Sequence, residues 1–96
     1  MKGDLPQGDK IKNFMNIKIY STPICPYCHL LKDYLKKNNF AFEDINVAED
    51  EVAAEEMVKK SGQMGVPVTI IITDQGQEEI IVGFDKLRLN QLLGIK

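Results

Sequence analysis

The residues of this chain best suited to chemistry are two cysteines two residues apart, in the segment Cys25-Pro26-Tyr27-Cys28. They are the only cysteines, and they lie between an apolar run that ends at Tyr20 and a helical pattern. A thiolate at a helix N-terminus is stabilised by free backbone N–H groups and by the positive end of the helix dipole. The placement therefore makes Cys25 a candidate nucleophile and Cys28 its disulfide partner, and it predicts reversible thiol–disulfide exchange.

Other interpretations of the two cysteines are inert thiols or half of a zinc site. A closed tetrahedral zinc site needs four ligands, and His29 is the only histidine in the chain. We therefore expect no metal site within one chain and no tightly bound cofactor. A homologue that binds an iron–sulfur cluster between two copies, or a scaffold protein without turnover, is the alternative from another functional class. His29 itself is either an aid to Cys25 or a solvated helix residue.

Size and charge limit the classes of function. The 96 residues predict one domain, and a net charge of −2 favours neither nucleic acid nor an anionic membrane as a partner. No run of 18 apolar residues occurs, and residues 1–14 lack the apolar core of a secretory signal. We expect a solvated tail over residues 1–14, a single domain over residues 15–96, and a cytoplasmic location, where a Cys-x-x-Cys pair indicates redox work.

Apolar periodicity and turn signals predict the elements that must position the cysteines. Their expected order is β-α-β-α-β-β-α, with strands over residues 17–20, 40–45, 68–73 and 79–82 and helices over residues 26–37, from near residue 50 to 61, and over residues 86–93. A helical crossover allows the first two strands to be parallel, and a short turn makes the last two antiparallel. We expect a helix to follow near Asp50 and to end at Gly62, and we expect Asp85 to cap the last helix, which ends at Gly94.

Apolar stripes predict which residues face the core. We expect the strand over residues 68–73 to be buried on both faces, because β-branched residues fill it. The apolar residues at helical spacing in the three helices are Leu30, Leu31, Tyr34 and Leu35, then Val52, Ala53, Met57 and Val58, then Leu89, Leu92 and Leu93.

A strand, Cys-Pro-Tyr-Cys, a helix, Val66-Pro67 and a hairpin ending in Gly83 together resemble a glutaredoxin of the thioredoxin-fold superfamily, over residues 16–94. The resemblance implies the α/β thioredoxin-like fold, with a four-stranded mixed sheet flanked by three helices. It also implies that Cys25 is the exposed attacking thiol and Cys28 the resolving thiol. It further implies a cis Val66–Pro67 bond, whose turn lets glutathione or a substrate peptide pair with the Val66 backbone as an added strand.

The same resemblance supplies the candidate residues for binding a substrate or glutathione. They are Thr22, Pro23, Tyr27, Gln63, Val66, Pro67, Gly83, Phe84 and Asp85. Asp85 is expected at least as a helix cap, and Phe84 either as a core residue or as a lip of the groove.

The chain also departs from glutathione-using members of the family. Thr22 and Gly65 stand where those members often have lysine and threonine, and Gly83-Phe84 is similar to redoxins that serve ribonucleotide reductase. Two electron donors therefore stay open, namely glutathione as a co-substrate and a flavoenzyme of the thioredoxin reductase type. The expected substrates are protein disulfides or glutathione mixed disulfides. A monomer is expected, because both sulfurs are committed to one another.

Overall fold

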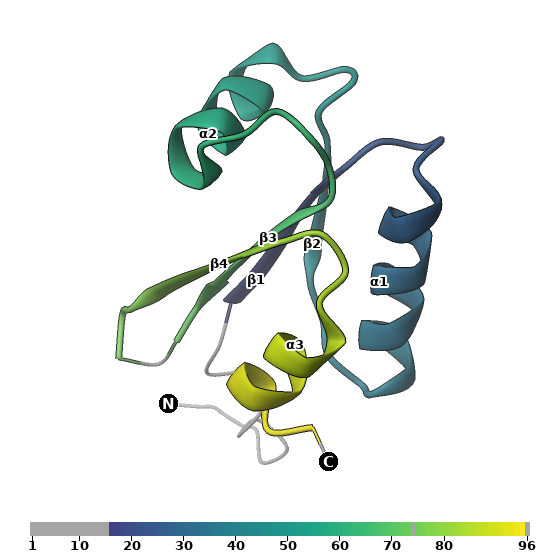
Figure 1. Ribbon diagram of the computed structural model, residues 1–96, viewed down its shortest axis with the longest axis vertical. Coiled ribbons are helices and arrows are strands. Elements are labelled where there is room, and N and C mark those ends of the chain that lie inside the picture. Colours follow the sequence, from purple (N-terminus) through teal and green to yellow (C-terminus); the bar gives the residue numbers. More distant parts are fainter. Residues whose placement is uncertain (1–15, 74, 96) are drawn as a thin grey trace, which may run out of the picture.

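A computed structural model describes residues 16–73 and 75–95 (Figure 1), so the predicted tail, residues 1–14, lies outside the described residues. The element order is the predicted one. The elements are β1 (Asn16–Ser21), α1 (Pro26–Lys37), β2 (Glu43–Asn46), α2 (Glu51–Ser61), β3 (Val68–Ile72), β4 (Glu78–Val82) and α3 (Lys86–Leu93). Among the described residues, no helix has both the length and the apolar character needed to cross a membrane.

The four strands form one mixed sheet in the order β2-β1-β3-β4. The crossover through α1 makes β1 and β2 parallel, with Ile19 opposite Asp44. β3 runs antiparallel to both of its neighbours, and its short connection to β4 forms the predicted hairpin. This arrangement confirms the predicted sheet and brings the end of β1, the beginning of β3 and the end of β4 to one end of the sheet, at the top in Figure 1.

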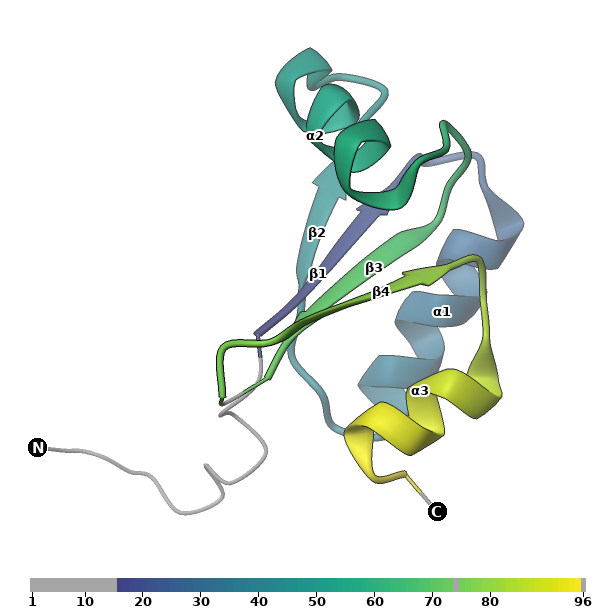
Figure 2. The ribbon, with the colours of Figure 1, turned by 60° about the vertical axis from the view of Figure 1, so that its left-hand side comes forward.

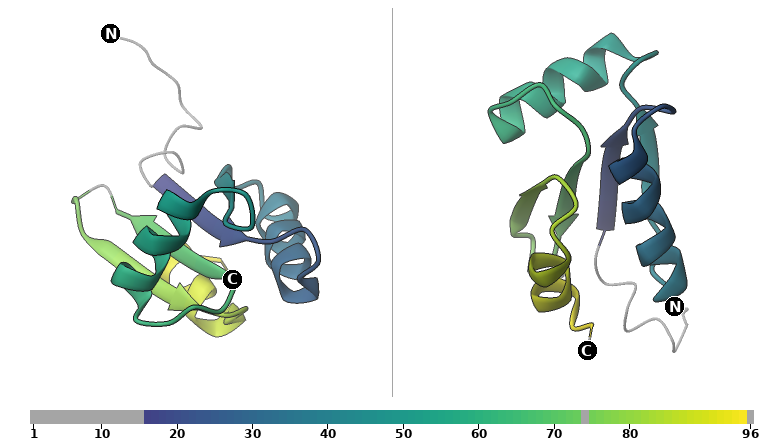
Figure 3. Two further views of the ribbon diagram at one scale, coloured as in Figure 1. Left: turned by 90° about the horizontal axis from the view of Figure 1, so that it is seen from above. Right: turned by 45° about the vertical axis from the view of Figure 1, so that its right-hand side comes forward.

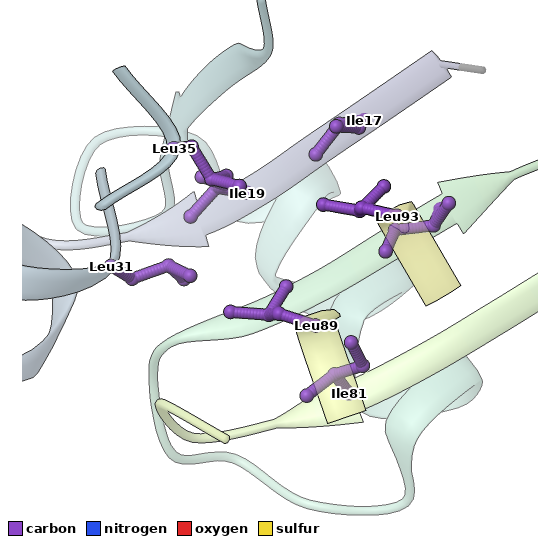
Figure 4. Packing of buried hydrophobic residues seen from close by; sticks show 8 residues of the cluster. Ile17, Ile19, Leu31, Leu35, Ile81, Leu89 and Leu93 are labelled. Carbon is purple, nitrogen blue, oxygen red and sulfur yellow. The ribbon is translucent and has the colours of Figure 1, made fainter. Parts of the chain in front are cut away.

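Helices cover the two faces of the sheet unequally. α1 and α3 lie on one face, and α2 alone lies on the other (Figures 2 and 3). Because successive strand residues point to opposite faces, Ile19 enters the cluster under α1 and α3 whereas Tyr20 enters the cluster under α2. The first cluster is aliphatic (Figure 4) and contains Ile17, Ile19, Leu31, Leu35, Ile71, Ile81, Leu89 and Leu93.

Helix ends follow the predicted local signals. The Asp50 carboxylate accepts a hydrogen bond from the Ala53 amide at 3.0 Å, and the Asp85 carboxylate accepts one from the Arg88 amide at 3.1 Å. Gly62 ends α2 in the left-handed conformation, with φ of 78°, and Gly94 ends α3 in the same way. These caps confirm the predicted boundaries of α2 and α3.

The predicted start of the second strand, at residue 40, is wrong, since β2 begins at Glu43. Asn39 has φ of 66°, and the Phe40 amide donates to the Leu35 carbonyl at 2.9 Å. Phe40 therefore belongs to the capping turn of α1 and packs its ring against the aliphatic cluster.

The predicted apolar stripe of α2 is half wrong. Ala53 and Met57, four residues apart, are buried against the sheet. Val52 and Val58 are exposed, because only one side of this helix meets the sheet and they flank the side that does. Leu30 is likewise half exposed on α1, next to the buried Leu31.

Candidate active site

Cys25 is the N-cap residue of α1, with an extended backbone conformation. Its sulfur accepts a hydrogen bond from the Cys28 amide at a Sγ–N distance of 3.2 Å, and its side chain is partly exposed. Pro26 follows at the first helical position, where a missing N–H has no cost. The sulfur therefore occupies the position of a capping oxygen, where free amides and the helix dipole stabilise negative charge.

Cys28 lies in the first turn of α1 directly beneath Cys25, and its side chain is fully buried. Both residues are free thiols. Burial, and then the hydrogen bond to Cys25, raise the pKa of Cys28 from 9.0 to about 11, although the Thr22 backbone and Lys32 act in the opposite direction. The pair thus consists of one accessible sulfur and one sheltered, protonated sulfur.

The segment before β3 lies across from Cys25. The Cys25 sulfur is 3.9 Å from the Val66 carbonyl oxygen. The bond between Val66 and Pro67 is cis, which confirms the implication of the resemblance. The Gly83 amide donates to the Pro67 carbonyl at 2.8 Å, so the end of β4 is joined to the same segment. Gly83 has φ of 79° with open space around its Cβ position, so glycine is favoured here for its conformation.

A groove of about 510 Å³ opens beside this segment. Its lining residues come from the first turn of α1, the segment before β3, and the passage from β4 into α3. They are Tyr27, Val66, Pro67, Val82, Gly83, Phe84, Asp85 and Lys86. A lining that mixes apolar side chains with one carboxylate and one ammonium group suits an extended peptide better than a compact anion.

Aromatic contacts hold one side of the groove. The Phe84 ring meets the Tyr34 ring edge-on, with centroids 5.8 Å apart, and the Lys86 ammonium lies 5.2 Å from the Tyr34 ring centroid. The Tyr34 hydroxyl in turn donates to the Asn90 side chain, which links α1 to α3. Phe84 therefore fills both roles that the sequence left open, as a partly buried core residue and as a lip of the groove.

A family model described as Glutaredoxin matches residues 17–75 of this chain. The chain belongs to the glutaredoxin family. A glutaredoxin-like 8.6 kDa protein encoded in a rubredoxin operon of Clostridium pasteurianum, itself uncharacterised, is 49% identical over 77 residues, which are 80% of this chain and 96% of that protein. Glutaredoxin 3 of Escherichia coli is 36% identical over 56 residues, 58% of this chain and 68% of its own length.

Solved structures show the same glutaredoxin-like fold. The solved structure of the glutaredoxin-like protein NrdH-redoxin from Escherichia coli, a protein with a thioredoxin-like activity profile, superposes with a TM-score of 0.67 and 31% identity. The match covers 80% of this chain and 93% of that one. The predicted α/β fold, with its mixed sheet and three helices, is therefore confirmed.

Six of the nine binding residues predicted from the glutaredoxin resemblance line the groove together. The other three lie outside its lining. Thr22 is half-buried, and its carbonyl accepts a hydrogen bond from the Cys25 amide at 3.4 Å. The Pro23 carbonyl lies 2.8 Å from His29 Nε2. The Gln63 side chain donates to the Gly65 carbonyl within its own loop. His29 thus holds the loop that precedes the two cysteines.

Val82 and Lys86 line the groove of this glutaredoxin but were not predicted. Strand alternation was a usable signal for Val82, because Ile81 beside it is buried and Val82 must point the other way. Lys86 is the first residue of α3, next to the predicted cap Asp85. Within residues 16–73 and 75–95, no group of three or more His, Cys, Asp or Glu side chains is placed to hold a metal ion.

Proposed function

We propose that this glutaredoxin-family protein is a dithiol thiol–disulfide oxidoreductase in which Cys25 attacks and Cys28 resolves. One observation carries the proposal. The partly exposed Cys25 sulfur accepts the Cys28 amide at the beginning of α1, while the Cys28 thiol is buried one turn below it. This geometry stabilises a thiolate where a substrate can reach it and keeps the second thiol out of solution until the first has reacted.

The reaction proceeds in two exchanges. The Cys25 thiolate attacks one sulfur of a substrate disulfide, forms a mixed disulfide and releases the first substrate thiolate. Cys28 then loses its proton to the buffer and attacks the Cys25 sulfur, so that the Cys25–Cys28 disulfide forms and the second substrate thiolate leaves. The substrate gains two electrons, and each released thiolate takes up a proton according to its own acidity.

The groove supports protein disulfides, or glutathione mixed disulfides, as substrates. An extended chain whose sulfur meets Cys25 can lie along Val66 and Pro67 and hydrogen-bond to the backbone there, as in strand addition. Asp85 and Lys86 at the far side offer opposite charges for the polar groups of that chain. The proposed setting is the cytoplasm, where a reducing environment keeps both thiols available.

A flavoenzyme of the thioredoxin reductase type is the second candidate for the electron donor, beside glutathione. Its support is the likeness to NrdH-redoxin of Escherichia coli, whose activity profile is thioredoxin-like. The test compares turnover with glutathione plus its reductase against turnover with NADPH plus thioredoxin reductase, at matched protein concentration. Activity only with the flavoenzyme would exclude glutathione as the donor, and activity only with glutathione would exclude the second candidate.

The test of the reaction itself uses reduction of insulin disulfides by dithiothreitol. We expect Cys25→Ser to lower the catalysed rate at least about 100-fold, because the nucleophile is lost. Reduced Cys28→Ser, mixed with insulin after dithiothreitol has been removed, should accumulate a mixed disulfide with the substrate, visible as an added mass that reducing agent then removes. Lys37→Met, an exposed change in the last turn of α1, is the control and should leave the rate unchanged. Full activity in Cys25→Ser would overturn the proposed function.

A further inference from the structure

A chain of polar contacts runs behind the buried cysteine. The Ser21 hydroxyl donates to one carboxylate oxygen of Asp44 at 2.6 Å, and the Lys32 ammonium donates to the other at 2.8 Å. The Lys32 side chain is only 15% exposed, and Ser21 is buried. These contacts join the end of β1, the middle of α1 and β2. Because the lysine of this ion pair is mostly buried, its ammonium group is held in one position.

The place of that ammonium group is defined relative to Cys28. Lys32 follows Cys28 by four residues on α1, and residues at this spacing lie on the same side of a helix. Lys32 also lowers the pKa of Cys28, in opposition to burial. The Asp44 carboxylate is kept ionised for this pairing. Burial opposes its charge, but the hydrogen bonds from Lys32 and Ser21 outweigh burial and lower the pKa of Asp44.

Other charges close to Cys28 are few. On its own helix and the adjoining loop, Cys25 and Lys32 are the charged groups that act on it, and the Thr22 backbone adds a hydrogen bond. The residues packed under α1 are the aliphatic members of the first cluster, such as Ile19 and Leu89. They come from β1, β3, β4 and α3. Among the described residues, the charge that opposes Lys32 most directly is therefore its own partner, Asp44, and the aliphatic surroundings screen the charge on Lys32 less than solvent would.

We propose that Lys32, held in place by Asp44 and Ser21, is a positioning residue for the second exchange and stabilises the thiolate that forms on Cys28. This inference rests on the proposed dithiol mechanism. Before the first exchange, negative charge on Cys25 disfavours charge on Cys28. Once Cys25 is part of a mixed disulfide, that repulsion is gone and Lys32 remains. Lys32 therefore favours the Cys28 thiolate throughout, and Cys25 no longer opposes this effect once the mixed disulfide has formed.

Lys32 supplies charge and no proton in this step. The Cys28 proton passes to the buffer, the new bond joins the sulfurs of Cys28 and Cys25, and the bond between Cys25 and the substrate sulfur breaks. The substrate sulfur leaves with the electron pair of that bond. Lys32 is the same at the beginning and at the end, so its removal should slow the second exchange and leave the first one intact.

The two exchanges can be followed separately with 5,5′-dithiobis(2-nitrobenzoate), which releases one coloured thiolate in each. Stopped-flow mixing with reduced protein should give a first phase whose rate rises with reagent concentration, from attack by Cys25. A second phase of equal amplitude, independent of reagent concentration, should follow from attack by Cys28. Both rates are measured across pH in every variant, together with thermal unfolding.

Lys32→Met should slow the second phase by roughly twofold to threefold near neutral pH, because the loss of thiolate is only partly offset by the higher nucleophilicity of a less acidic thiol. Lys32→Arg keeps the charge and should restore most of the rate. Asp44→Asn keeps the hydrogen-bond acceptor but removes the counter-charge, so it should speed the second phase or move its pH profile to lower pH. Lys37→Met, exposed on the same helix, is the matched control and should change neither phase.

Electrostatic positioning predicts a slower second phase in Lys32→Met and a faster one in Asp44→Asn. A merely structural role of the ion pair would slow the second phase in both variants. Equal slowing of the two phases in Lys32→Met, no rescue by Lys32→Arg, or the same slowing in Lys37→Met would each overturn the inference. A wild-type protein that releases only one equivalent of coloured thiolate would instead overturn the proposed dithiol mechanism. The two failures are therefore distinguishable in one experiment.

Discussion

The two faces of the sheet differ in how their buried residues are held. Under α1 and α3 the cluster is aliphatic, and the two helices over it are joined by Tyr34 and Asn90. Under α2 the cluster of buried residues is smaller, and Tyr20 contributes a polar link to Glu56 at 2.7 Å. Both cysteines belong to α1 and its cap. Both cysteines are therefore attached to the face with the larger buried cluster, whereas α2 leads along the chain into the Val66–Pro67 segment.

The largest expected effect tests this difference in packing. Leu31→Ala should lower the free energy of unfolding by about 3–4 kcal/mol, because the fully buried side chain leaves a cavity among aliphatic neighbours. Met57→Ala should cost about 2 kcal/mol, because the flexible methionine side chain packs in the smaller cluster, where neighbours can adjust to its loss. Urea unfolding measures both, with Leu87→Ala as the exposed control on α3. Equal losses for Leu31 and Met57 would contradict the comparison.

A second, smaller effect concerns the polar link on the α2 face. Tyr20→Phe should cost about 1–2 kcal/mol at neutral pH, because the Glu56 carboxylate loses its donor. Burial, and then the hydrogen bond to Glu56, raise the pKa of Tyr20 above its ordinary value of 10.0. The contribution of this hydroxyl is therefore complete below pH 10 and is lost as pH rises further.

The measurement for Tyr20 is urea unfolding of both proteins between pH 7 and pH 11. Wild type should lose stability more steeply than Tyr20→Phe above pH 10. Parallel curves over this range would mean that the hydroxyl link contributes nothing specific to the α2 face.

The smallest effect lies on the α1 face, at the ion pair behind Cys28. The pKa of Asp44 is lowered below 3.8 by Lys32 and Ser21 against the opposing effect of burial, so its contribution is present above that pH and is lost as pH falls. The carboxylate side chain is 42% exposed, and Asp44→Asn should therefore cost less than about 1 kcal/mol at neutral pH. Unfolding at pH 6 and pH 3 should show the two proteins converging in acid, and a constant difference would count against the ion pair.

Much of the fold could be predicted because its signals are local. Asp50 and Asp85 cap helices through their own side chains, and Gly62 can adopt the left-handed conformation that ends α2. The start of β2 could not be predicted, because Phe40 is as suitable for a strand as for a capping turn. The hydrogen bond from the Phe40 amide to the Leu35 carbonyl places the residue in the capping turn. The exposure of Val58 also depends on how α2 is placed over the sheet, which no local pattern specifies.

The parts of the site that lie close together in the sequence were easier to predict than the parts that only the fold brings together. The spacing of Cys25 and Cys28 indicated the chemistry directly, whereas the opposing Val66–Pro67 segment came only from the family resemblance. The link from Lys32 to Asp44 was missed. It depends on parallel pairing that sets Asp44 opposite Ile19, and thus on a register that residues on separate elements acquire only in the fold.

The capping role of Cys25 provides a way to follow the oxidation state of its sulfur. The Cys28 amide donates to the Cys25 sulfur, so the group that reacts is also the group that completes the beginning of α1. A thiolate accepts that hydrogen bond more strongly than a disulfide sulfur does. The amide proton of Cys28 is therefore a natural NMR reporter, whose chemical shift and exchange with solvent follow the oxidation of the neighbouring sulfur without any added label.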